Sequence, residues 1–70
     1  MRYATASANE LIEWGVQVLE LREADRETRA PADCKQRDYD RAKAIGATLS
    51  QANMLCRDAQ AFLDRRGVKA

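Results

Sequence analysis

The sequence predicts an all-α fold, and specifically an antiparallel hairpin of two helices. Apolar side chains recur at spacings of three and four residues in two long segments, which is the period of one helical face. Pro31 is the one proline, and it lies between the two segments. The chain holds 70 residues, and we expect them to form a single helical-hairpin domain over residues 1–70.

The first helix is expected over about residues 8–29, after a short frayed arm. Ser7 followed by Glu10 fits the capping box, in which the two side chains satisfy backbone N–H groups at the helix start. Two apolar stripes follow, Leu11, Trp14, Val18 and Leu21 in one and Ile12, Val16 and Leu19 in the other. They leave only a narrow polar line of Glu10, Glu13, Gln17 and Glu20.

The width of this apolar surface predicts self-association. A surface helix of a monomer needs an apolar arc of roughly 100°, and the arc here is wider. In a two-helix chain, one of the two helices needed to cover it comes from another copy. We therefore expect a homodimer with a four-helix arrangement. Its predicted core and dimer residues are Leu11, Trp14, Val18, Leu21, Ile45, Leu49, Cys56 and Leu63.

The second helix is expected over about residues 34–66, after a turn at about 30–33 with Asp33 as the candidate cap. Its small-residue seam keeps a spacing of three and four over three heptads, through Ala42, Ile45, Leu49, Ala52, Cys56, Ala59 and Leu63. Gly46 is a candidate bend within it, and Gly67 suits its end. On one continuous helix Cys34 and Cys56 lie roughly 33 Å apart. Both thiols are therefore expected to be reduced, and Cys34, at a helix start, is a candidate reactive thiol.

The composition argues against catalysis. Histidine is absent, which excludes nucleophile–base pairs built on His and most catalytic zinc sites. Twelve Lys and Arg face eleven Asp and Glu, for a net charge of +1, and the two signs alternate along the chain. We expect a protein that is not an enzyme, without cofactor or metal. Because no apolar run approaches the roughly 20 residues of a membrane span, a cytoplasmic location is expected.

A mixed-charge segment around the predicted turn is the candidate partner-binding surface. Over residues 22–43 there are seven basic and six acidic side chains, which is a poor phosphate footprint and favours a protein partner over nucleic acid. Arginine and tyrosine are enriched in the residues that dominate protein interfaces. The predicted partner-binding residues are Arg26, Arg29, Arg37, Tyr39 and Arg41.

Two known kinds of protein resemble this layout. The alanine-rich seam of Ala42, Ala52 and Ala59 and the two helices are similar to the Rop-type RNA-binding hairpin, although its basic RNA-binding face is not evident. In length and in its helical-hairpin layout, the chain also resembles the small quorum-sensing anti-activator of Pseudomonas phages. That resemblance implies a dimer that binds a LuxR-type transcription regulator and a type IV pilus assembly ATPase.

The function expected from these observations is a small protein-binding regulator that inhibits a larger partner by stoichiometric binding. The phage resemblance implies a transcription-factor anti-activator of phage origin. A Rop-like dimer associated with RNA or DNA is the first alternative. A small structural or chaperone subunit of a larger assembly is the second. A pull-down with and without nuclease separates the first two of these functions.

Overall fold

The computed structural model describes residues 1–67 and contains three helices, α1 (Ala8–Thr28), α2 (Pro31–Ala44) and α3 (Leu49–Arg65). The described residues include no strand, so the all-α class is confirmed. The two-helix hairpin is wrong, because the segment predicted as one helix over residues 34–66 is divided into α2 and α3. Gly67, expected at a helix end, follows the C-cap of α3 with a φ of +73°.

Helix α1 begins as predicted. The Ser7 side chain accepts a hydrogen bond from the Glu10 backbone N–H at 3.2 Å, and the Glu10 carboxylate accepts one from the Ser7 N–H at 3.0 Å. That backbone hydrogen bond lowers the pKa of Glu10 below its ordinary value. The residues before α1 are not the frayed arm that we expected, because the Tyr3 N–H donates to the Ile45 carbonyl at 2.6 Å.

Helix α2 starts earlier than predicted, and a proline sets its first turn. Pro31 occupies the first turn, where the missing N–H costs nothing because that group has no partner within a helix. The N-cap is Ala30, without a side-chain cap, and Asp33 lies inside the first turn rather than capping it. The predicted turn at residues 30–33 is therefore shorter, and it lies between Thr28 and Pro31.

The chain turns sharply between α2 and α3, at the glycine that the sequence marked as a candidate bend. Gly46 has a φ of +75°, a conformation that side chains other than glycine rarely adopt. The Ala47 N–H donates back to the Ala42 carbonyl at 2.9 Å and closes the end of α2. Thr48 and Gln51 then form a second capping box, with hydrogen bonds of 2.9 and 3.1 Å, that starts α3.

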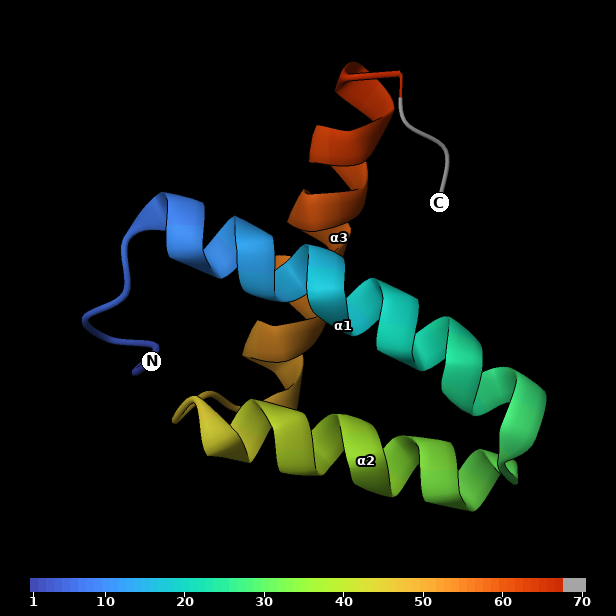
Figure 1. Cartoon of the computed structure of the whole chain (residues 1–70). Helices are drawn as coiled ribbons and strands as arrows, with labels where there is room; N and C mark the ends of the chain where they lie inside the picture. The colour runs from blue at the N-terminus through green and yellow to red at the C-terminus, as the bar shows by residue number, and fades with distance from the viewer. Residues whose placement is uncertain (68–70) are drawn as a thin grey trace.

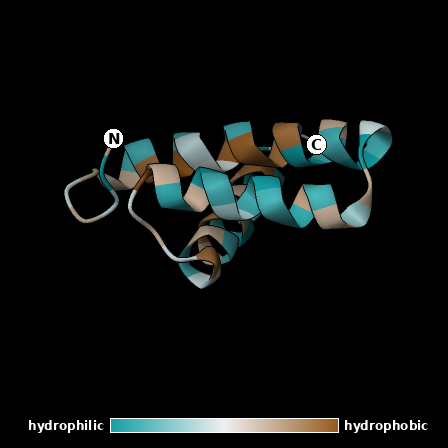
Figure 2. Cartoon of the chain, turned by 90° about the horizontal axis from the view of Figure 1, so that it is seen from below, coloured by the Kyte–Doolittle hydropathy of each residue, from teal (hydrophilic) through white to brown (hydrophobic). Residues whose placement is uncertain are grey.

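The three helices form a thin slab with extents of 31 × 29 × 16 Å. Helices α1 and α2 run antiparallel to each other, and α3 crosses behind α1, its last turns projecting past it (Figure 1). Figure 2 shows α3 on one side of the α1–α2 pair. Both neighbours of α1 thus come from the same chain, so the argument that one of them belongs to a second copy no longer holds.

The closest approach in the slab is between α1 and α3 at Gly15. A Cβ atom on Gly15 would lie 2.8 Å from the Cβ of Ala59 and 2.8 Å from the backbone oxygen of Leu55. Glycine is therefore required here by the neighbouring helix. The buried apolar side chains around the three helices are Val18, Ala42, Ile45, Ala52, Leu55, Cys56 and Ala59.

The predicted core is buried only in part. Val18, Ile45 and Cys56 are buried. Leu11, Trp14, Leu49 and Leu63 are half-buried, and Leu21 is 46% exposed. Leu21 is therefore not a core residue of this chain. Among the described residues no helix has both the length and the apolar character needed to cross a membrane.

Candidate functional site

A buried carboxylate organises the end of the α1–α2 pair. Asp25, on α1, is only 5% exposed. It accepts hydrogen bonds from Arg41 Nη1 at 2.7 Å and from Arg37 Nε at 3.0 Å, both on α2. Arg29 Nε lies 3.6 Å from the same carboxylate. A buried carboxylate needs such partners, because an unpaired charge away from water is strongly unfavourable.

The electrostatics of Asp25 follow from these contacts. The hydrogen bond from Arg41 lowers the pKa of Asp25 below its ordinary value and outweighs burial, which acts in the opposite direction. The positive charges of Arg41 and Arg37 lower the pKa further. Asp25 is thus an ionised anchor for guanidinium groups, and the geometry gives it a structural role.

A second carboxylate extends this network to all three helices. Asp38, on α2, accepts a hydrogen bond from Arg22 Nε of α1 at 3.0 Å. Arg41 Nη1 lies 3.5 Å from the same Asp38 oxygen and so joins the two carboxylates. Arg22 Nη2 also donates to Asn53 Oδ1 on α3 at 2.8 Å. We call these residues and Asp25, Arg29 and Arg37 the arginine–aspartate network.

The structure brings together three of the five predicted partner-binding residues. Arg29, Arg37 and Arg41 meet at Asp25, whereas Arg26 and Tyr39 lie exposed outside the network. The Arg41 side chain is 14% exposed and is committed to the fold. Those of Arg29 and Arg37 are 44% and 42% exposed, so their guanidinium groups are anchored yet reachable from solvent.

Asp25 and Asp38 are the centres of this cluster, although neither was among the predicted site residues. A signal for Asp25 was available, because it follows Val18 by seven residues and so continues the buried stripe of α1. A carboxylate on a buried stripe calls for a cationic partner. Asp38 carries no comparable signal, since its pairing with Arg22 depends on how α2 is placed against α1.

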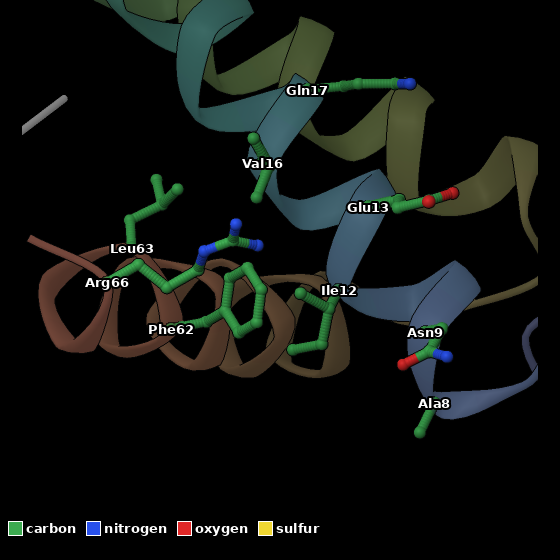
Figure 3. A pocket seen from close by; sticks show the side chains of 9 residues that line it. All are labelled: Ala8, Asn9, Ile12, Glu13, Val16, Gln17, Phe62, Leu63 and Arg66. Carbon is green, nitrogen blue, oxygen red and sulfur yellow. The ribbon is translucent and has the colours of Figure 1, made fainter. Parts of the chain in front are cut away.

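An apolar groove of about 510 Å³ forms a second candidate surface, between the first half of α1 and the last turns of α3. Ile12 and Val16 of α1 and Phe62 of α3 form its floor and wall, with Ile12 directed at Phe62 (Figure 3). The Arg66 guanidinium lies over the Phe62 ring, 5.4 Å from its centre. All three apolar side chains are half-buried, so the chain itself leaves this groove incompletely covered.

The two cysteines lie in different surroundings, and neither is in a disulfide. The separation argument for reduced thiols was wrong, because Cys34 and Cys56 belong to two helices rather than one. Burial raises the pKa of the Cys56 thiol, against a lowering effect of Arg22. Cys34 is half-buried, and its Sγ donates to the Arg29 carbonyl at 3.9 Å. Within residues 1–67 no group of three or more Cys, Asp or Glu side chains is placed to hold a metal ion.

Comparisons of the chain with family models, with curated proteins and with solved structures found no match. The resemblances to the phage anti-activator and to the Rop-type hairpin therefore rest on layout alone. The three-helix structure also differs from the two-helix layout on which both were based. The surfaces described above are therefore the basis for a functional proposal.

Proposed function

We propose that the chain is a protein-binding regulator that inhibits a larger partner by stoichiometric binding. The observation that supports this proposal is the anchoring of Arg29 and Arg37 on buried Asp25, with about two fifths of each side chain exposed. Arginine side chains that are held in place before binding lose less conformational entropy in a complex. The surface offers guanidinium groups to carboxylates of a partner protein.

We assign two further exposed side chains to the proposed binding residues, because neither takes part in the ion pairs of the described fold. Arg26 is exposed and forms no ion pair within residues 1–67, and Tyr39 is 50% exposed. The exposed acidic residues of the same region, Glu23, Glu27 and Asp40, oppose a continuous phosphate-binding face. A protein with both charge signs opposite these positions fits better than a nucleic acid.

The test is a pull-down from lysate, with and without nuclease, using the Arg26→Ala/Tyr39→Ala double variant. This variant should keep its melting temperature, because neither side chain contributes to the buried core. It should lose about 2 kcal/mol of binding, roughly thirtyfold in Kd, as residues that dominate an interface do. The matched control is Met54→Ala/Arg57→Ala, which removes two exposed side chains of α3.

The outcomes distinguish the candidate functions. Normal capture by the Arg26→Ala/Tyr39→Ala variant contradicts the proposed surface. A partner that disappears after nuclease treatment favours the Rop-like function instead. The first purified partners to test are those that the phage resemblance implies, a LuxR-type regulator and a type IV pilus assembly ATPase.

A further inference from the structure

The apolar groove between α1 and α3 has a ridge beside it. The last turns of α3 project past α1 (Figure 1), and Phe62 and Leu63 lie in the last turn of α3, where they line the groove. The floor of the groove, Ile12 and Val16, lies on α1. Such a surface can bind a second copy of the chain, because the ridge of each copy can insert into the groove of the other.

The two edges of the groove carry opposite charges. On the α1 edge, Glu13 is exposed and points away from Phe62 (Figure 3), and Glu10 and Glu20 share its polar line. On the α3 edge, Arg66 is exposed over the Phe62 ring, beside exposed Arg65. Neither Glu13 nor Arg66 forms an ion pair within residues 1–67. An acidic and a basic edge therefore flank the apolar floor.

We propose that this groove is the interface of a homodimer. A two-fold axis that runs along the groove places each edge of one copy against the opposite edge of the other. Phe62 of each copy then lies over Ile12 and Val16 of the other, and Arg66 of each copy faces Glu13. Both ion pairs form by the same symmetry. A second copy of the chain carries both matching edges by symmetry, whereas a partner of another sequence would need to provide a basic and an acidic edge at the same spacing.

A stable interface takes about 800 Å² from each partner, which is roughly one sixth of the 5128 Å² of accessible surface of the chain. The proposed interface must therefore extend beyond the floor of the groove onto the neighbouring surfaces of α1 and α3. The inference is independent of the proposed regulatory function, because no residue of the arginine–aspartate network lines the groove.

Charge reversal provides the test. In a dimer of Glu13→Arg, two arginines face each other at both symmetric contacts, and in a dimer of Arg66→Glu, two glutamates do. Each variant alone should therefore dimerise about tenfold more weakly. An equimolar mixture of the two variants should recover dimerisation, because a heterodimer regains opposite charges at both contacts. Sedimentation equilibrium at micromolar concentration gives the masses, and the monomer is 7.9 kDa.

Two further variants probe the apolar floor. Val16→Glu should abolish the dimer, whereas Met54→Glu, on an exposed position of α3, should leave it intact. Circular dichroism identifies any variant that fails to fold. If Val16→Glu does not fold, the charge-reversal pair alone tests the proposed interface. A native chain that sediments at 7.9 kDa overturns the proposal. So does a dimer that Glu13→Arg and Arg66→Glu leave unchanged, or a mixture that recovers nothing.

Discussion

Replacing Gly15 by alanine places a methyl group at the crossing of α1 and α3. The new Cβ would lie 2.8 Å from the Ala59 Cβ, 2.8 Å from the Leu55 oxygen and 3.3 Å from the Leu55 carbonyl carbon. Carbon atoms in favourable contact are about 3.5–4.0 Å apart, so the helices must separate by roughly 1 Å. Two of these neighbours are backbone atoms of Leu55, which cannot rotate away.

Two effects of opposite sign set the magnitude. Alanine favours a helix over glycine by about 1 kcal/mol, while overpacking a core costs about 1–3 kcal/mol. Because the clash involves backbone, we take the upper end, which leaves a net loss of about 2 kcal/mol. For a domain of this size that lowers the melting temperature by about 10 °C.

Thermal unfolding followed by far-ultraviolet circular dichroism measures this change. Ala24→Gly, at an exposed position of the same helix, calibrates the propensity effect and should cost about 1 kcal/mol. Gly15→Ala/Ala59→Gly should be more stable than the sum of the single variants predicts, because one of the two shortest contacts is removed. A Gly15→Ala chain that melts at or above the native temperature refutes the close approach of α1 and α3.

The remaining predictions concern titration and thiol reactivity. The pKa of Asp25 is lower in the folded chain than in the unfolded chain, so its stabilising effect is present above the unfolded pKa of about 3.9 and is lost as the pH falls through the folded value. Melting temperatures measured from neutral pH down to about pH 2 should therefore fall more steeply for the native chain than for Asp25→Asn, and parallel curves contradict the ionised anchor. In thiol titration both cysteines should react under denaturing conditions, but Cys34 should react faster than Cys56 in the folded chain, because Cys56 is buried and burial raises its pKa. Equal rates in the folded chain would contradict this difference.

Local signals in the sequence were sufficient for α1 but not for the break after α2. The capping box of Ser7 and Glu10 fixed the first residue of α1, because it depends only on neighbouring residues. Local signals of the same kind are present at the break, Gly46 and the capping box of Thr48 and Gln51, but Gly46 was predicted only as a bend and the capping box was not among the predicted helix starts. The seam of small residues argued against a break, since its spacing continues through the turn.

The seam misled because a turn can preserve which residues face inward. Ala42 and Ile45 are buried at the end of α2, and Ala52 and Cys56 are buried in α3, so the periodic pattern describes burial correctly. It does not specify whether one helix or two present those residues. Only the contacts of α3 with α1, centred on Gly15, decide between the two arrangements.

The candidate site was predictable in composition but not in pairing. The sequence predicted that Arg29, Arg37 and Arg41 lie in one charged region, and in the structure these three residues do lie together. Which carboxylate holds them depends on the positions of α1 and α2, and six acidic side chains were available in residues 22–43. Identifying Asp25 as the carboxylate that holds them requires knowing that it is buried, and its burial depends on how the helices pack.

The contacts of Arg22 have a consequence for the modularity of the chain. One guanidinium group, on α1, bonds Asp38 of α2 and Asn53 of α3. Removing α3 would deprive Arg22 of one acceptor and would also uncover Gly15, where the α1 backbone is least shielded by its own side chains. No pair of helices keeps all of its polar partners without the third. We therefore expect α1 and α2 without α3 to be less stable than the three helices together.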